Sequence, residues 1–162
     1  MGCSSFLIND KAYIVGGSTS SSQTKNEVWE YDITNDSWKK KNNLPFEGTW
    51  RGNGFSISDT VYVCNGVMAN GAYLREMYRY DQLQDSWSVL NITLPDRKYS
   101  ACAVIGRKAC FYGGTDSLKN FTNDFRTYHP DEGYSSAYSG FAVARKGGMA
   151  FTLDGYFIIP VA

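Results

Sequence analysis

Short apolar runs, separated by residues typical of tight turns, recur along the whole chain. Residues 6–8 and 12–15 form the first two runs, and Asn9-Asp10 stands between them. Asn and Asp accept the positive φ values that a two-residue hairpin turn requires. The runs are rich in β-branched and aromatic residues, and they lack the i, i+3, i+4, i+7 spacing of an amphipathic helix. The pattern therefore predicts antiparallel hairpins rather than helices.

A third and a fourth strand are predicted to follow each hairpin. In the first unit a polar loop over residues 18–26 leads to a run at 28–31, in which side chains alternate as in a strand packed on both faces. Residues 32–37 have the composition of a turn, and Trp38 begins a fourth strand. The other hairpin turns are predicted at Ser58-Asp59, Gly106-Arg107 and Asp154-Gly155. Each unit thus reads as a four-stranded antiparallel sheet.

The same landmarks return with a period of 48–49 residues. The block at 27–32 recurs at 76–81 and, less closely, at 124–129. A pair of residues containing glycine precedes each block, and a large aromatic residue follows it. A fixed order at a fixed spacing is typical of a repeat architecture. The landmarks are Gly16, Gly17, Tyr31, Asp32 and Trp38, then Asn65, Gly66, Tyr80, Asp81 and Trp87, then Gly113, Gly114, Tyr128, His129 and Tyr134.

With these landmarks the chain resembles the kelch repeat family. The marks of the family are the glycine pair, a gap of about ten polar residues, Tyr-Asp, and a Trp some seven residues after the Tyr. This chain departs from the pattern at Asn65, His129 and Tyr134. The resemblance covers nearly the whole chain and implies an all-β fold, a β-propeller of four-stranded antiparallel blades. It is specific for the fold and says little about function.

The spacing divides the kelch repeat region, residues 1–162, into three blades and half of a fourth. We expect blades over about 3–43, 52–92 and 99–137, and a half blade over about 149–162. Kelch propellers commonly close with six or seven blades, so the resemblance implies an incomplete ring. An open arc exposes sheet edges and blade faces to water. We therefore expect the remaining blades to come from a longer parent chain or from an oligomer.

Composition narrows the classes of partner. Lys+Arg and Asp+Glu both number 16, whereas nucleic-acid binding needs a basic surplus or stripe; nucleic acid is therefore not an expected partner. No apolar run reaches the roughly 18 residues of a membrane-spanning helix, so no membrane span is expected. The first residues lack the features of a signal peptide. Cytoplasmic and exported locations both stay open.

Cysteine and histidine usage predicts no metal and no cofactor. The four cysteines form no CxxC pair, and the chain has one His, so the usual zinc ligand sets are missing. With a turn at Gly106-Arg107, Ala103 faces Cys110 and Cys102 faces Phe111. This register favours buried free thiols over a disulfide.

Three arginines stand just before the first strand of successive units: Arg51, Arg97 and Arg145. Arg97 and Arg145 are 48 residues apart, whereas Arg51 is displaced from that register by two positions. Equivalent positions in a propeller form a ring around one mouth of the channel, where guanidiniums would bind carboxylates through paired donors. In some kelch proteins arginines at such loop ends bind acidic peptide segments. The alternative is that these arginines brace loops against backbone carbonyls or neighbouring blades.

The loops after the glycine pairs, residues 18–26, 67–75 and 115–123, differ completely from one another. A constant scaffold with unequal loops is typical of a binding platform. Three aromatic residues, Trp50, Tyr73 and Phe121, are predicted to be exposed in loops and to anchor a partner. The alternative is that they cap the hydrophobic rim.

The sequence therefore predicts a non-catalytic binding or scaffold module that recognises a protein, a peptide or an acidic ligand. The copper oxidases that share the kelch propeller need two His ligands, which one His does not supply. A kelch-type sugar mutarotase needs only a few Arg and carboxylate groups in the channel mouth, so a carbohydrate-binding or mutarotase-like propeller is the alternative. A purely structural arc of a larger propeller is the second alternative. His129, at a turn after a strand, is expected to be structural.

Overall fold

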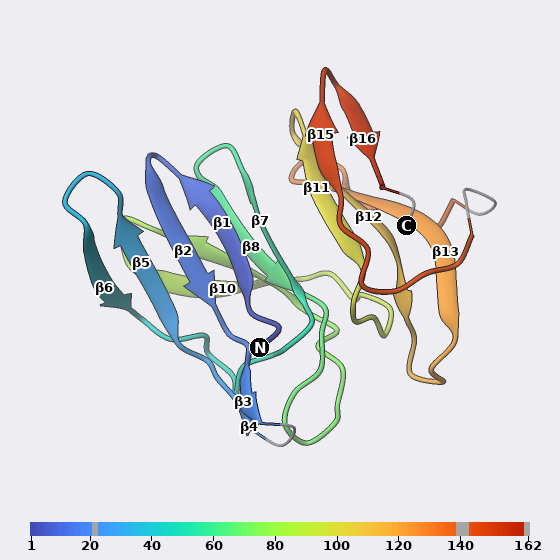
Figure 1. Ribbon diagram of the computed structural model, residues 1–162, viewed down its shortest axis with the longest axis horizontal. Coiled ribbons are helices and arrows are strands. Elements are labelled where there is room, and N and C mark those ends of the chain that lie inside the picture. Colours follow the sequence, from blue (N-terminus) through green and yellow to red (C-terminus); the bar gives the residue numbers. More distant parts are fainter. Residues whose placement is uncertain (21–22, 139–142, 161–162) are drawn as a thin grey trace.

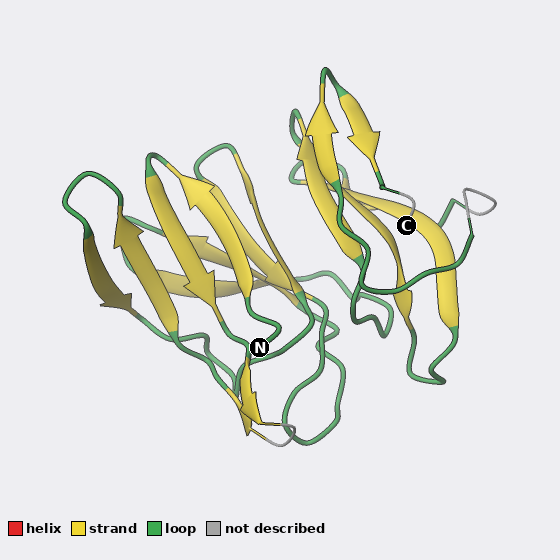
Figure 2. Ribbon diagram, viewed as in Figure 1, coloured by secondary structure: helices red, strands yellow, loops and turns green. Residues whose placement is uncertain are grey.

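The computed structural model describes residues 1–20, 23–138 and 143–160, and every regular element in these ranges is a β-strand (Figures 1 and 2). Most strands form three four-stranded sheets and one two-stranded sheet, which follow one another as an open arc without a closed ring. The predicted all-β, partial propeller fold is confirmed. Residues 21–22 of the first long loop and 161–162 of the predicted half blade lie outside the described residues. No described helix is long and apolar enough to cross a membrane.

Each four-stranded sheet is antiparallel, and its strands lie side by side in the order in which they occur along the chain. The first sheet contains β1 (Ser4–Ile8), β2 (Lys11–Val15), β5 (Val28–Asp32) and β6 (Ser37–Lys41). The second contains β7 (Asn53–Ile57), β8 (Thr60–Cys64), β9 (Met77–Asp81) and β10 (Ser86–Leu90). The third contains β11 (Ala101–Ile105), β12 (Lys108–Thr115), β13 (Phe121–His129) and β14 (Gly133–Tyr134), and the last hairpin contains β15 (Phe151–Leu153) and β16 (Tyr156–Ile158).

Two elements differ from the sequence prediction. The first long loop, predicted to be irregular, contains a small hairpin of β3 (Ser18–Ser20) and β4 (Gln23–Thr24). The third long loop is shorter than the predicted 115–123, because β12 runs through the glycine pair and β13 already begins at Phe121. A bulge between Tyr112 and Gly114 allows β12 to continue past the glycines while it stays paired with β13.

All four hairpin turns stand where the sequence predicts them. Each is a two-residue turn, closed by the pairs Ile8–Lys11, Ile57–Thr60, Ile105–Lys108 and Leu153–Tyr156. At Asn9 and Asp10 φ is 47° and 61°, and at Asp154 and Gly155 it is 50° and 79°. Positive φ at both positions is the type I′ geometry, whose twist matches that of the flanking strands.

The cysteine hairpin also has the predicted register. Ala103 pairs with Cys110 and Cys102 with Phe111, and all four cysteines of the chain are free. Burial raises the pKa of the Cys64, Cys102 and Cys110 thiols. These side chains therefore stay protonated and pack as small apolar groups.

The repeated Tyr, Asp and Trp stabilise the turn between the third and fourth strands of a sheet. In the first sheet the Tyr31 hydroxyl donates to Asp36 at 2.6 Å, and the Tyr31 and Trp38 rings lie 4.9 Å apart. Asp32 accepts from the backbone N–H groups of Thr34 and Asn35, both at 3.0 Å. The second sheet repeats these contacts through Tyr80, Asp81, Asp85 and Trp87.

The two departures in the third sheet keep part of this arrangement. Nδ1 of His129 accepts from the backbone N–H of Asp131 at 3.2 Å, as Asp32 accepts from Thr34 two residues further on. Tyr134 pairs with Tyr128 across the strands, at the position that Trp38 takes opposite Tyr31. His129 thus serves a structural role, as a turn-capping acceptor.

The second pair of landmarks shows why a glycine pair recurs. Asn65 and Gly66 have φ of 60° and 90°, close to the values at the other two pairs. Asn tolerates left-handed backbone, so it replaces the first Gly at little cost. The second position has no room for a side chain, because a Cβ on Gly66 would lie 2.7 Å from the carbonyl oxygen of Trp50. Close approach of the next linker therefore requires glycine there.

The core consists of two interfaces between neighbouring sheets. Alternate residues of one strand face opposite neighbours: Val61 and Val63 of β8 pack on the first sheet, whereas Tyr62 and Cys64 pack toward the third. The first interface also contains Ile8, Tyr13, Val15, Val28, Leu44 and Tyr80. The second contains Phe55, Ile57, Met77, Leu94, Ala109, Phe111 and Tyr128. Burial on both faces explains why β8 is apolar nearly throughout.

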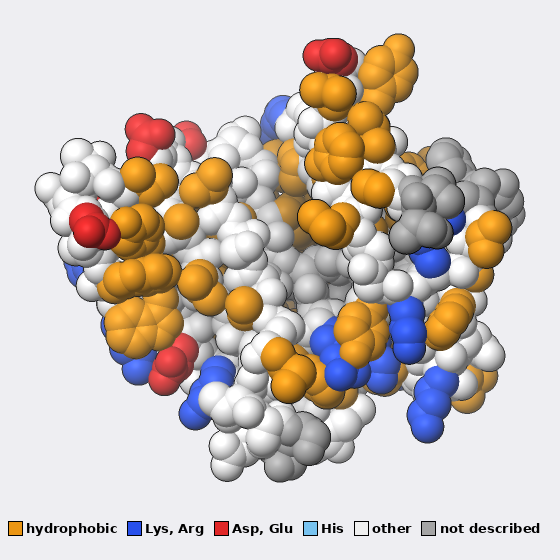
Figure 3. Space-filling view, viewed as in Figure 1, with side chains coloured by type: hydrophobic (Ala, Val, Ile, Leu, Met, Phe, Trp, Pro, Cys, Tyr) orange, Lys and Arg blue, Asp and Glu red, His pale blue; other side chains and the backbone are white. Residues whose placement is uncertain are grey.

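The same register leaves an apolar face uncovered at each end of the arc. Ile14 and Trp38 stand at the positions of Val63 and Trp87, yet they are 37% and 54% exposed. Figure 3 shows hydrophobic side chains gathered on this side of the molecule, where Figure 1 places β2, β5 and β6. At the other end, the β15–β16 hairpin exposes Phe151, Leu153 and Tyr156.

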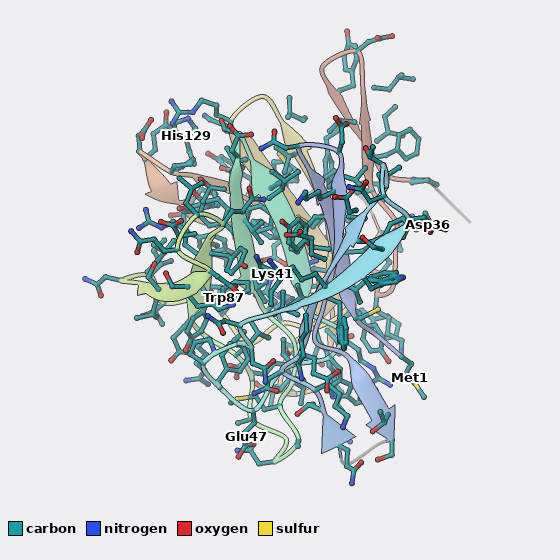
Figure 4. All side chains as sticks on the ribbon, turned by 90° about the vertical axis from the view of Figure 1, so that its left-hand side faces the viewer. Met1, Asp36, Lys41, Glu47, Trp87 and His129 are labelled. Carbon is teal, nitrogen blue, oxygen red and sulfur yellow. The ribbon has the colours of Figure 1, made fainter. Side chains whose placement is uncertain are left out.

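A network of charged side chains crosses the first interface. Glu30, only 7% exposed, accepts from the Tyr13 hydroxyl at 2.6 Å and from Lys11 at 3.0 Å. Nζ of Lys41 lies 3.8 Å from Glu30 and 3.9 Å from Asp85 of the second sheet; Lys41 and Trp87 are both labelled in Figure 4. Burial alone would raise the pKa of Glu30, but the hydrogen bonds from Tyr13 and Lys11 and the charge of Lys41 hold it below its ordinary value.

We expect Glu30→Gln to lower the free energy of unfolding by about 1–3 kcal/mol at pH 7, because the variant loses the charge that pairs with buried donors. The pKa of Glu30 is lower in the folded chain, so its stabilisation is complete above the ordinary Glu value of about 4.3 and is lost as pH falls through the folded value. Urea unfolding at pH 7 and pH 3 should show a difference between the two proteins that shrinks at acid pH.

Glu47→Gln is the matched control, since Glu47 is exposed and forms no ion pair within 4.0 Å in the described part of the chain. It should unfold like the unmodified protein at both pH values. A Glu30→Gln deficit that is equally large at pH 3 would show that the carboxylate charge is not its source.

Candidate functional site

Turns and long loops lie at opposite ends of the sheets. The short turns, which carry Asp36 and His129, are at one end, and the linker that carries Glu47 is at the other (Figures 1 and 4). The second end, here called the loop face, also carries the linkers before the first strand of each sheet. It consists of residues 16–20, 23–27, 42–52, 65–76, 91–100, 116–120, 135–138 and 143–150.

A backbone ladder joins the linkers across the loop face. The N–H of Arg51 donates to the carbonyl of Gly2, that of Tyr99 to Arg51, and that of Gly147 to Tyr99, each at 2.9 Å. Successive residues of this set of four are 48–49 positions apart in the sequence, and all four have φ between 60° and 68°. Left-handed backbone costs about 1–2 kcal/mol at a residue other than glycine, so Arg51 and Tyr99 stand at positions where glycine would be less strained.

A second set of contacts shows the true register of the arginines. The carbonyls of Thr49, Arg97 and Arg145 accept from the second glycine of successive pairs, at 2.8, 2.7 and 2.8 Å. Arg97 and Arg145 are therefore equivalent to Thr49. Arg51 occupies the position that Tyr99 takes in the next linker, which accounts for its displacement by two residues.

The structure places the three arginines in three different environments. Arg97 is 8% exposed and forms an ion pair with Asp124 at 3.0 Å. Arg145 donates to the carbonyls of Val143 and Pro160, both at 3.3 Å. The guanidinium of Arg51 instead stacks 3.4 Å from the centroid of the Trp50 ring. Arg97 and Arg145 thus brace the fold, and Arg51 alone of the three stacks on aromatic rings of the loop face.

Cations and aromatic rings alternate beyond Arg51. Its guanidinium lies 4.3 Å from the centroid of Tyr99, and Nζ of Lys146 lies 5.9 Å from Tyr99 and 5.1 Å from Phe121. We call these residues the cation–aromatic row: Trp50, Arg51, Tyr99, Lys146 and Phe121. Figure 3 shows Lys and Arg side chains interleaved with hydrophobic ones on the lower part of the visible surface. Such contacts are worth about 0.5–1 kcal/mol each at exposed sites.

The predicted aromatic residues all lie next to a cation. Trp50 and Phe121 belong to the row. The prediction that all three are exposed in loops is wrong in part: Trp50 and Tyr73 are only partly exposed, and Phe121, which is 52% exposed, is the first residue of β13. Tyr73 lies beside the row: Nζ of Lys98 is 5.5 Å from its ring, and its hydroxyl donates to the carbonyl of Asp116 at 3.0 Å.

Sequence reasoning missed Tyr99, Lys98 and Lys146. Lys98 and Lys146 are 48 residues apart, and Tyr99 follows Arg51 by the same interval. An alignment of the linkers by the repeat period, rather than by residue type, would have identified these positions as candidates.

The cations that lie on aromatic rings of the loop face lack acidic partners. Within the described residues no carboxylate lies within 4.0 Å of Arg51, Lys98 or Lys146. The carboxylates of Asp96 and Asp124 form ion pairs with Arg75 and Arg97 respectively. These three neighbouring positive charges are therefore unpaired, although the chain as a whole has no net charge.

The groove along the first strands offers little chemistry. It has a volume of about 500 Å³ and runs over β1, β7 and β11, and its lining contains no ionisable side chain. In the described ranges no group of three or more His, Cys, Asp or Glu could hold a metal ion.

Comparisons with known proteins support the kelch resemblance. A family model described as the Attractin/LZTR1 beta-propeller matches residues 1–160. The solved structure titled "Structure of YjhT" is similar to this chain with a TM-score of 0.83 over 98% of the chain, at 16% sequence identity. That likeness shows the fold alone, and the chain spans 58% of that structure's length. No curated protein matches. Because the family model covers nearly all of its residues, the chain belongs to the Attractin/LZTR1 β-propeller family and forms part of a kelch-type propeller.

Proposed function

We propose that this chain is a non-catalytic binding module whose loop face recognises an acidic segment of a partner protein. The observation that carries the proposal is the cation–aromatic row, in which Arg51 and Lys146 are held on aromatic rings without a carboxylate partner. An acidic segment would supply the missing negative charges. The planar guanidinium binds carboxylates through two parallel hydrogen bonds. The exposed ring of Phe121 and the partly exposed rings of Trp50 and Tyr99 offer apolar anchors.

The strained backbone supports the same proposal. Gly2 and Gly147 occupy the first and last positions of the ladder, whereas Arg51 and Tyr99 hold the two between them in left-handed conformation. Strained residues cluster at functional sites because they cost stability that a purely structural position would not require. The side chains of Arg51 and Tyr99 are therefore better explained by binding than by folding.

We expect Arg51→Gly to weaken binding of a short labelled peptide rich in Asp and Glu at least tenfold, or about 1.4 kcal/mol. The free energy of unfolding should change by less than about 1 kcal/mol, because relief of the left-handed strain offsets the lost ring contacts. Fluorescence anisotropy at about 50 and 200 mM salt, with urea unfolding in parallel, measures both. Binding by the unmodified chain should weaken at the higher salt.

Arg107→Gly is the matched control, since Arg107 lies on a short turn at the opposite end and pairs with Asp131. It should bind like the unmodified chain. Equal losses in the two variants, or equal affinity for the amide peptide in which Asn and Gln replace Asp and Glu, would refute the proposed site. Binding of a neutral oligosaccharide instead of the acidic peptide would favour the carbohydrate alternative.

We infer, as a second role, that the arc is completed by further kelch-type sheets, from a longer parent chain or from other copies. In the first interface the Trp87 indole donates to the carbonyl of Asn42 at 3.1 Å, and Asp85 accepts from the Asn42 N–H at 3.0 Å. Trp38 and Asp36 stand at the equivalent positions of the first sheet, where no described residue supplies these partners. A further sheet packed on the uncovered face of the first sheet would supply both the carbonyl and the N–H group, if its fourth strand ended as β6 does.

The purified 162-residue chain should therefore self-associate, and Trp38→Ala should shift it toward the monomer because the uncovered face loses its largest side chain. Light scattering behind a sizing column measures the mass. Trp87→Ala is the comparison, since Trp87 packs inside the first interface; it should lower the free energy of unfolding by about 2 kcal/mol. A stable, monodisperse monomer of the unmodified chain would contradict the inference.

A further inference from the structure

A small polar cavity lies between the second and third sheets, and none of the five residues of the cation–aromatic row lines it. Its volume is about 10 Å³. Five polar residues line it from separate places: Asn65 after β8, Arg97 and Ser100 in the linker before β11, and Asp124 and Arg126 on β13. The rings of Phe111 and Tyr134 also line it. The cavity thus joins parts of the chain that meet only in the folded structure.

Three of these side chains each have one buried atom without a hydrogen-bond partner among the described residues. These atoms are Oδ1 of Asn65, Nη1 of Arg97 and Oδ1 of Asp124. Other atoms of the same side chains are already paired: Nδ2 of Asn65 donates to Asn53 at 2.9 Å, and Nη2 of Arg97 donates to Asp124 at 3.0 Å. Asn65 and Arg97 are 2% and 8% exposed, so bulk solvent does not satisfy them. Buried polar atoms left in this state cost free energy.

The three atoms present one donor and two acceptors. A water molecule would accept from Nη1 of Arg97 and donate its two hydrogens to Asn65 and Asp124. Buried waters typically make about three hydrogen bonds, and 10 Å³ is close to the smallest space that holds one. An anion would face two acceptor oxygens, and a metal ion would face a guanidinium. We propose that a single structural water molecule binds here and bridges the second and third sheets.

The bound water keeps Arg97 in the interior. The backbone carbonyl of Arg97 already accepts from Gly66 at 2.7 Å, and the water adds a link from its guanidinium to Asn65. The second sheet supplies an acceptor, Oδ1 of Asn65, because Asn65 replaces the first glycine of the family's pair. The equivalent residues of the first and third sheets, Gly16 and Gly113, have no side chain and supply no such acceptor. The departure from the family pattern is thus what completes the site. This inference does not depend on the proposed binding function.

A crystal structure of the unmodified chain at about 1.5 Å resolution tests the site directly. We expect a density peak that refines as water, 2.6–3.2 Å from each of the three atoms. Three results would overturn the proposal: an empty cavity, an Arg97 or Asp124 side chain rotated onto another protein group, or an anomalous peak there after a bromide soak.

Water ¹⁷O relaxation dispersion of Asn65→Gly provides a second test in solution. Glycine fits the left-handed backbone there, as it does at the equivalent residues 16 and 113, so the variant should fold while it loses one acceptor. We expect about one fewer long-lived internal water than in the unmodified chain. Asn70→Gly, in an exposed loop, is the control and should keep the count. An unchanged count in Asn65→Gly would refute the bridging role.

Discussion

The need of each sheet for a neighbour on both faces is the constraint on which the rest of this structure depends. Side chains of a strand alternate between its faces, so Val63 packs toward the first sheet and Tyr62 toward the third. In β8, an inner strand of the second sheet, neither face is free for polar residues. Both faces of such a sheet are buried only when another sheet packs on each side. The two ends of the arc therefore carry uncovered apolar faces.

Packing also sets the spacing of the linkers on the loop face. Because neighbouring sheets stand side by side, each linker meets the next through the same backbone hydrogen bonds, from Gly2 to Arg51, Tyr99 and Gly147. Side chains at the ladder positions are held in line, and a guanidinium on one linker can stack on a ring from the next. The cation–aromatic row is thus a product of the repeat geometry, although no repeat contains the whole row.

Features governed by near neighbours in the sequence could be predicted well. The hairpin turns follow from residues such as Asn9 and Asp10 that tolerate positive φ, and the strands follow from alternation and β-branched content. The positions of the three arginines could not be predicted in the same way, and the expected ring does not form. Residue type suggested that Arg51, Arg97 and Arg145 were equivalent, but the backbone contacts place Arg51 with Tyr99 and Arg97 with Thr49. A shift of two positions along a linker decides whether a side chain lies on the loop face or inside.

The sequence by itself determined the all-β repeat, its period, its turns and the residues that cap them, because turn conformation and strand alternation depend on residues a few positions apart. Only the tertiary structure decided which charged groups stay available. Arg97 is buried because Asp124 and Asn65, 27 and 32 residues away in the sequence, meet it between two sheets. Arg51 stays on the loop face because rings, and no carboxylate, surround it. The energy of a charge depends on what is near it in space, and that is settled only when the sheets pack.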